Sequence, residues 1–141
     1  MDKIVLVTGT FNICHSGHVR LLEFASRFGK VIVGINSDDF LWNKYGKDKT
    51  VRMSERAYVL KSLKYVDDVV VFTETHPGKL IEKIKPNFYV KGPDYKDVSL
   101  PEEFSIYEVG CKLIIHNIEK ENSTSKIIFW HIEYSFLVDH K

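Results

Sequence analysis

The chain has 141 residues, 44% of them hydrophobic, and a formal net charge of +1. This length suffices for one domain with a substantial core, but not for two ordinary domains. The net charge does not indicate a nucleic-acid partner, and no apolar run is long enough to indicate a membrane span. The amino terminus lacks the layout of a signal peptide. We therefore expect a cytoplasmic protein that binds neither nucleic acid nor a membrane.

Strand-like and helix-like segments alternate along the chain. Apolar runs predict strands at residues 3–8, 31–35, 68–72, 88–90 and 112–116. Helical spacing and helix-start residues predict helices at 19–28, 54–64, 78–84, 102–109 and 126–136. Ser54 is expected to cap the second helix, and Ser123 or Thr124 the last. Residues 39–51, with Gly46 and several lysines, predict an exposed loop.

This alternation is typical of a parallel sheet covered by helices on both faces. The sequence therefore predicts an α/β fold, a Rossmann-like doubly wound parallel sheet of five strands, in a single domain over residues 1–131. The aromatic-rich tail at 132–141 either extends the last helix or packs on a partner subunit. Ligands of such folds bind at the carboxyl ends of the strands.

The stretch His15-Ser16-Gly17-His18 lies where the first strand hands over to the first helix. The first turn of a helix carries unpaired N–H groups and a partial positive charge. Two imidazoles three residues apart at that turn, beside glycines that let a ligand approach the backbone, favour the binding of a polyphosphate.

Further phosphate-binding residue types follow the other strands, and in a parallel sheet these positions share one edge. Lysines and Arg56 follow the second strand, Lys91 ends the fourth, and the run 122–126 follows the fifth. The chain has neither the G-x-x-x-x-G-K-[ST] phosphate loop nor the G-x-G-x-x-G dinucleotide turn, so the first helix must bind phosphates in another way.

These residues resemble a known family. Gly9-Thr10-Phe11-Asn12 and His15-Ser16-Gly17-His18 resemble the G-T-F-D and H-x-G-H signature of the cytidylyltransferase-like nucleotidyltransferase superfamily, and Ser123-Thr124 resembles its second signature. The similarity covers about residues 3–130. Ile35-Asn36-Ser37-Asp38 and Lys91-Gly92-Pro93-Asp94-Tyr95 are most similar to bacterial heptose-1-phosphate adenylyltransferases, with glycerol-3-phosphate cytidylyltransferases nearly as similar.

The resemblance implies a reaction in which an acceptor phosphate attacks the α-phosphorus of a nucleoside triphosphate and pyrophosphate leaves. A phosphate monoester is already anionic near neutral pH, so no general base is required. The protein must instead offset the charge of two anions that meet. The triphosphate implies bound Mg²⁺, and the family resemblance implies a homodimer. No protein metal site of three ligands is apparent in the sequence.

The resemblance assigns roles residue by residue. The catalytic residues are His15, His18, Lys44 and Arg56. The nucleotide-binding residues are the two histidines together with Gly9, Thr10, Phe11, Asn12, Gly17, Lys91, Gly92, Asp94, Asn122, Ser123 and Thr124. The acceptor-binding residues are Asp38, Lys47, Lys64 and Tyr95.

Simpler interpretations stand beside these roles. Lys44 and Lys47 suit an ordinary solvated loop, and Arg56 suits a surface ion pair of little energetic value. Ser123 and Thr124 would cap a helix in any protein. Cys14 is interpreted as a small packed residue rather than as a thiol whose pKa His15 lowers.

Two departures from the family pattern bear on the substrate. Asn12 stands where the family has aspartate, which keeps the hydrogen-bonding shape but loses a charge. Residues 118–124 lack the arginine that begins the Arg-Thr-Glu-Gly-Ile-Ser-Thr run of glycerol-3-phosphate cytidylyltransferases. This favours ATP and a heptose-1-phosphate-like acceptor over CTP and a polyol phosphate. A nucleotide-binding regulator without catalysis, supported by Asn12 alone, is the third hypothesis.

Overall fold

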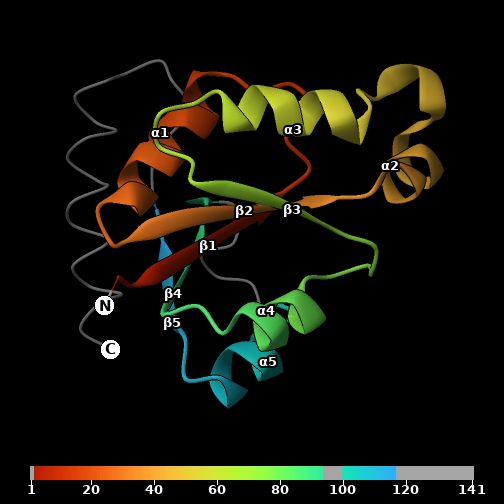
Figure 1. The fold of residues 1–141 in the computed structure, drawn as a ribbon. Coiled ribbons are helices and arrows are strands. Elements are labelled where there is room, and N and C mark those ends of the chain that lie inside the picture. The colour runs from red at the N-terminus through yellow and green to blue at the C-terminus, as the bar shows by residue number, and fades with distance from the viewer. Residues whose placement is uncertain (1, 94–99, 117–141) are drawn as a thin grey trace.

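The computed structural model describes residues 2–93 and 100–116. Five parallel strands within these ranges form one sheet in the order β3-β2-β1-β4-β5 (Figure 1). The strands are β1 (Ile4–Gly9), β2 (Lys30–Asn36), β3 (Asp68–Phe72), β4 (Phe88–Lys91) and β5 (Lys112–Ile115). The predicted doubly wound parallel sheet is confirmed.

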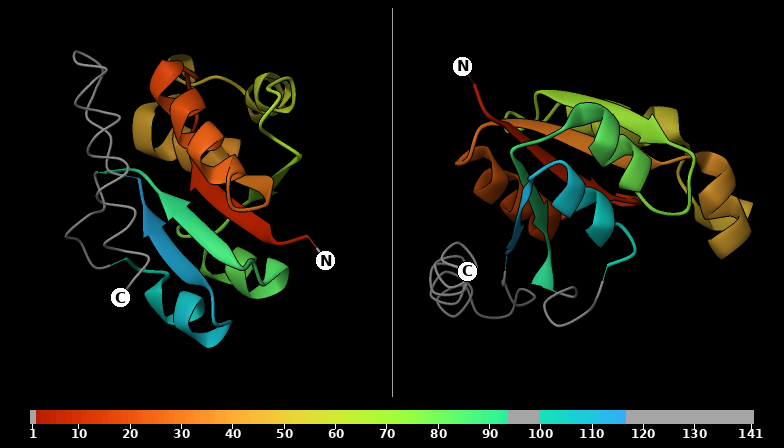
Figure 2. Two further views of the ribbon diagram at one scale, coloured as in Figure 1. Left: turned by 90° about the vertical axis from the view of Figure 1, so that its left-hand side faces the viewer. Right: turned by 90° about the horizontal axis from the view of Figure 1, so that it is seen from below.

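Helices cover both faces of the sheet (Figures 1 and 2). On one face lie α1 (Ser16–Ser26) and α3 (Met53–Lys61), and on the other lie α4 (Gly78–Ile84) and α5 (Glu103–Glu108). After β3 the chain returns to the far side of β1 and pairs β4 with it. The chain therefore reverses its direction of winding between β1 and β4, where such folds bind their ligands. No helix in the described ranges has the length and hydropathy of a membrane span.

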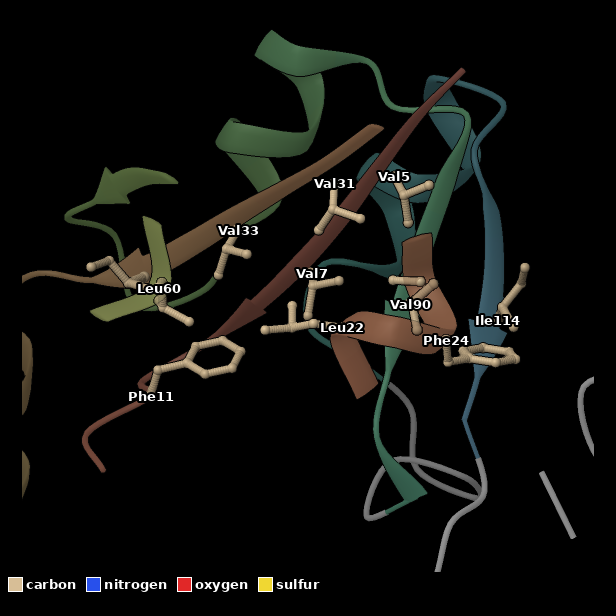
Figure 3. Packing of buried hydrophobic residues seen from close by; sticks show 12 residues of the cluster. Val5, Val7, Phe11, Leu22, Phe24, Val31, Val33, Leu60, Val90 and Ile114 are labelled. Carbon is tan, nitrogen blue, oxygen red and sulfur yellow. The ribbon is translucent and has the colours of Figure 1, made fainter. Parts of the chain in front are cut away.

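Alternation along the strands divides the core into two clusters. Val5 and Val7 face α1 and α3 and pack with Leu22 and Leu60, as Figure 3 shows. Leu6, between them in β1, belongs to the cluster on the opposite face, with the residues Phe72, Leu80, Ile81, Tyr89, Leu100 and Ile106. Both faces of the central strand are thus buried, as its continuous apolar run predicts.

The expected loop at 39–51 is wrong. The chain forms α2 (Asp38–Tyr45) and a short 3₁₀ helix (Lys47–Lys49) there. Ser37 caps α2 by accepting a bond from the Phe40 N–H, and two aspartates occupy the first turn, where they favour the helix dipole. The fully buried Leu41 anchors the helix.

Two predicted helix starts are also corrected. The first helix begins three residues earlier than expected, at Ser16, because His15 caps it. The helix predicted at 54–64 is α3, which begins at Met53 with Arg52 at the cap position. Ser54 therefore lies inside the helix rather than before it. The predicted helix at 126–136 lies outside the described residues.

Candidate functional site

The core fixes the turn that leaves β1. A Cβ on Gly9 would lie 3.1 Å from Phe11 Cε2, so the ring of Phe11 occupies the space that a side chain there would need. Phe11 has a φ of 47°, a left-handed conformation that costs a residue with a side chain about 1–3 kcal/mol. Its buried ring packs in the same cluster as Leu22 and Leu60, which offsets that cost (Figure 3).

The two histidines cap α1 reciprocally. His15 Nδ1 accepts a hydrogen bond of 3.1 Å from the Gly17 N–H, and the His15 N–H donates at 3.3 Å to His18 Nδ1. The rings stack with centroids 3.9 Å apart and planes 23° apart. This pattern resembles a capping box in which imidazole nitrogens replace side-chain oxygens. A neutral imidazole has one acceptor and one donor nitrogen, so both neutral rings carry their proton on Nε2.

His18 is held as a neutral donor. Burial lowers the pKa of His18 below the usual 6.5, and the charge of His15 lowers it further. A hydrogen bond with the Ile13 backbone raises this pKa and so opposes the shift in part. The ring of Phe11, with its centroid 4.9 Å away, contributes to that burial. Protonation would also place a proton on Nδ1 and break the bond from the His15 N–H. At neutral pH the pair therefore offers oriented N–H dipoles, and His18 adds no positive charge.

Asn12 fastens the loop that follows α2. Its Nδ2 donates to the Lys49 carbonyl at 3.0 Å, and its Oδ1 accepts from the Val51 N–H at 2.7 Å. An aspartate could accept the second bond but could not donate the first. The amide therefore fits the backbone that it contacts, which gives a local reason for the departure from the family pattern.

Arg56 lies inside the protein. Its Nε donates to the Val51 carbonyl at 2.8 Å, its Nη1 to the Thr10 carbonyl at 2.9 Å, and its Nη2 pairs with Asp38 Oδ1 at 3.2 Å. The side chain has 0% exposure. Asp38 Oδ1 also accepts from the Met53 N–H at 2.7 Å. The guanidinium thus joins the turn after β1 to α2 and α3, a buried placement rather than the surface ion pair considered from the sequence.

Lys44 and Lys47 are exposed on the segment after β2. The Lys44 ammonium lies 5.3 Å from the centroid of the Tyr45 ring, and the Lys47 ammonium lies 4.9 Å from that of Trp42. Both residues belong to the chain that leaves the carboxyl end of β2, the same edge as the histidines. The structure places them at this edge but shows no contact between them and the histidine pair.

The structure does not bring Lys64 to this edge. Lys64 precedes β3 and lines an open hollow with Lys3, Lys30 and Asp67, which lie at the amino-terminal ends of the strands. That end of the sheet is opposite the histidines. The predicted acceptor role of Lys64 is therefore incompatible with a site at the carboxyl edge.

Lys91 and Gly92 lie at the carboxyl end of β4, next to β1. Lys91 is buried, and its Nζ lies 3.4 Å from Thr8 Oγ1. A Cβ on Gly92 would meet no atom within 4 Å. Asp94, Tyr95, Asn122, Ser123 and Thr124 lie outside the described residues.

Cys14 packs at the edge of the core cluster under α1. Burial raises its pKa, so the thiol is less acidic than usual despite its neighbour His15. The interpretation of Cys14 as a small packed residue is supported.

Asn12 and Asp38 each use a side-chain oxygen to hold the backbone around the turn after β1. Asn12 Oδ1 accepts from Val51, and Asp38 Oδ1 accepts from both Arg56 and Met53. No group of three His, Cys, Asp or Glu residues in the described ranges could hold a metal ion.

Together, the sheet order and the strand–turn–helix unit define a Rossmann-like α/β domain whose candidate ligand site is the start of its first helix. The chain matches the family model described as cytidylyltransferase-like over residues 6–133. It therefore belongs to the cytidylyltransferase-like family, and the resemblance seen in its motifs is confirmed at that level.

Individual relatives agree with this membership. The chain is 41% identical over 128 residues to the Bifunctional protein HldE of Campylobacter jejuni subsp. doylei and 35% identical over 129 residues to that of Coxiella burnetii. These matches cover 89% and 90% of this chain but 27% of each relative, so the chain spans about a quarter of their length.

Solved structures show the same fold. A lipopolysaccharide core biosynthesis protein from Thermoplasma volcanium superposes with a TM-score of 0.69 at 26% identity, covering 86% of this chain and all of that one. The pantoate-beta-alanine ligase of Francisella tularensis shares the fold with a TM-score of 0.56 at 18% identity, covering 86% of this chain and 61% of its own.

Proposed function

We propose that this protein transfers a nucleotidyl group from a nucleoside triphosphate to the phosphate of a small sugar phosphate, with release of pyrophosphate. The reciprocal capping of α1 by His15 and His18 is the observation that carries the proposal, since it aims Nε2–H donors from a helix start. Membership of the cytidylyltransferase-like family supports the same reaction.

ATP and a heptose-1-phosphate-like acceptor are the first choice of substrates. The motifs Ile35-Asn36-Ser37-Asp38 and Lys91-Gly92-Pro93-Asp94-Tyr95 carry that resemblance. The matches to Bifunctional protein HldE and to a lipopolysaccharide core biosynthesis protein support a sugar phosphate over a polyol phosphate. CTP with glycerol-3-phosphate is the alternative that the sequence motifs leave open.

In this reaction an acceptor phosphate oxygen forms a bond to the α-phosphorus, and the bond from that phosphorus to the β-phosphate bridging oxygen breaks. The attacking oxygen is already anionic, so no side chain need take a proton. The Nε2–H groups of His15 and His18 and the N–H groups of the first turn of α1 would bind the phosphate oxygens. Lys44, Lys47 and Lys91 would supply positive charge, and Mg²⁺ would arrive with the triphosphate.

Arg56 and Asp38 receive a different role from the one that the family resemblance implies. Because the Arg56 side chain is fully buried and bonded to the Thr10 carbonyl, we assign it to positioning the phosphate-binding turn. Asp38, paired with that guanidinium, would act in the same way rather than by binding the acceptor.

Several assignments remain proposals on the strength of the family resemblance. Gly9, Thr10 and Gly17 would let phosphates approach the backbone, and Phe11 and Asn12 would fix the turn. Gly92, Asp94, Asn122, Ser123 and Thr124 would complete the nucleotide site, and Tyr95 the acceptor site. We also propose a cytoplasmic homodimer that binds no nucleic acid.

The regulator hypothesis loses its support from the sequence. Asn12 was its only basis, and the bonds from Asn12 to Lys49 and Val51 explain the residue without any loss of catalysis. A catalytic protein is therefore the function that the site supports best.

The test is pyrophosphate release from all four nucleoside triphosphates with a panel containing heptose-1-phosphate and glycerol-3-phosphate. We expect turnover with ATP and the heptose phosphate. His15→Asn keeps a good helix cap but lacks the Nε2–H donor, so kcat should fall by about 10²–10³ with little change in Tm. Absence of turnover with every pair, from folded wild-type protein, would refute the proposal.

A further inference from the structure

Four polar side chains form a buried cluster beneath the edge of the sheet where β1 and β4 meet. The Tyr89 hydroxyl lies 2.7 Å from Thr8 Oγ1 and 2.6 Å from Glu102 Oε2. The Lys91 ammonium lies 3.4 Å from Thr8 Oγ1 and 4.0 Å from Glu102 Oε2. The cluster joins three elements, because Glu102 is the cap residue of α5.

The hydrogen bonds of this cluster all donate in the same direction, toward Glu102. The single Tyr89 proton is donated to Glu102, so the Tyr89 oxygen must accept from the Thr8 hydroxyl. The Thr8 oxygen in turn accepts from the Lys91 ammonium. A chain therefore runs from Lys91 through Thr8 and Tyr89 to the Glu102 carboxylate, and its orientation depends on the acceptor at its end.

Burial makes the two charges depend on each other. The side chains of Lys91 and Glu102 are 8% and 3% exposed. Burial lowers the pKa of Lys91, and the Glu102 charge opposes that shift. Neutralising this carboxylate would therefore remove a charge that offsets part of the cost of burying the ammonium.

The position of the cluster connects it to the histidine site. Thr8 and Gly9 are consecutive residues of β1, and Thr10 follows in the turn that Phe11 and Asn12 complete. Lys91 is the last residue of β4, the strand paired with β1. Glu102, by contrast, lies outside every sequence motif that pointed to phosphate binding.

We propose that Glu102 is a positioning residue for nucleotidyl transfer, which acts through Tyr89 to orient the Thr8 hydroxyl and to hold the Lys91 ammonium at the junction of β1 and β4. The inference rests on the proposed function, because it assumes that Lys91 meets the substrates there. Glu102 itself is not assigned a contact with substrate.

A double-mutant cycle tests this dependence. Glu102→Gln keeps the shape and removes the charge, Lys91→Met removes the ammonium, and the third variant combines them. We expect Glu102→Gln to lower kcat/KM by about tenfold, and the double variant to be no worse than Lys91→Met alone, because Glu102 acts through Lys91. Losses that multiply in the double variant would overturn the inference.

The pH profile supplies a readout that a merely structural role would not move. Among the described residues, the groups shown to face the Lys91 ammonium include Glu102 at the start of α5, Tyr89 from β4 and Thr8 from β1. Removing the Glu102 charge lowers the Lys91 pKa further, so the alkaline limb of kcat/KM should move to lower pH. Tyr89→Phe keeps the carboxylate and should lower kcat/KM without moving that limb.

Controls separate the possible failures. Thermal unfolding identifies a Glu102→Gln protein that does not fold, in which case Tyr89→Phe serves as the test and must lower kcat/KM. If wild-type protein turns over and every variant with an intact Lys91 stays within twofold of it, the inference falls alone. If wild-type protein shows no turnover with any substrate pair, the proposed function falls and the inference with it.

Discussion

Replacing Arg56 by methionine separates positioning from direct phosphate binding. The structure buries the guanidinium completely and bonds it to the Val51 and Thr10 carbonyls and to Asp38. Methionine fills a similar volume but donates no hydrogen bond. The variant therefore removes the Arg56 hydrogen bonds to two backbone carbonyls and leaves the Asp38 carboxylate without its paired charge, and we expect it to lose stability as well as activity.

The size of the stability loss follows from the partners. Breaking a buried charge pair by removing one member costs about 3–5 kcal/mol. For a domain of this size each kcal/mol lowers Tm by about 3–4 °C, so the expected decrease is roughly 10–20 °C. Arg56→Lys keeps the charge but cannot reach all three acceptors from one ammonium, and should fall between methionine and wild type.

The assay is thermal unfolding of the free protein beside kcat/KM for pyrophosphate release. If Arg56 instead bound phosphate directly, Arg56→Met would lose activity while its Tm stayed within about 2 °C of wild type. That result would refute the positioning argument. Asp38→Asn is the matched control, since it retains both hydrogen bonds to Oδ1 and removes only the charge, and should cost less than Arg56→Met.

Three further predictions concern the histidine turn. Gly17→Ala places a Cβ 2.9 Å from His15 Cε1 and should displace that ring, so kcat should fall at least tenfold. Tm should change little, because the gain of about 1 kcal/mol in helix propensity offsets the weakened cap from His15. Asn12→Asp should lower the free energy of unfolding by about 1 kcal/mol through loss of the bond to the Lys49 carbonyl, measured by urea denaturation, and an unchanged midpoint would contradict the assigned bond. In the unfolded chain His18 is protonated near pH 6.5, and in the folded protein only at lower pH. His18 therefore contributes stability above pH 6.5 that is lost as the pH falls toward the lowered pKa. If the Tm values of His18→Gln and wild type change in parallel over a pH series, this argument is wrong.

Local patterns were sufficient to predict the sheet. The strand at Asp68–Phe72 was placed to the residue and the ends of the other strands to within one residue, because an apolar run between turn residues is a local property of the chain. The start of α1 was missed because histidine is not among the usual capping residues, and only the geometry shows imidazole nitrogens in that role. In α2, several lysines concealed a good start signal in Ser37-Asp38-Asp39.

The site was predicted less completely, for reasons of topology. Residues that follow strands reach the carboxyl edge, and those that precede strands reach the opposite one, so the position of Lys64 before β3 was a usable warning. The burial of Arg56 depends on the carbonyls of Thr10 and Val51, which are far apart in the sequence. No local sequence pattern predicts a contact of this kind. The role proposed for Glu102 depends in the same way on partners in two strands.

The attachment of the segment between Asp38 and Val51 has a consequence for how its surface can change. Val51 is held through its own backbone, with its N–H on Asn12 and its carbonyl on Arg56. The side chains of Lys44, Lys47 and Lys49 in this segment are exposed and take no part in these two bonds. These lysines can therefore be exchanged without loss of the backbone bonds at Val51, so the exposed surface of the segment can vary while its attachment to the rest of the domain is kept.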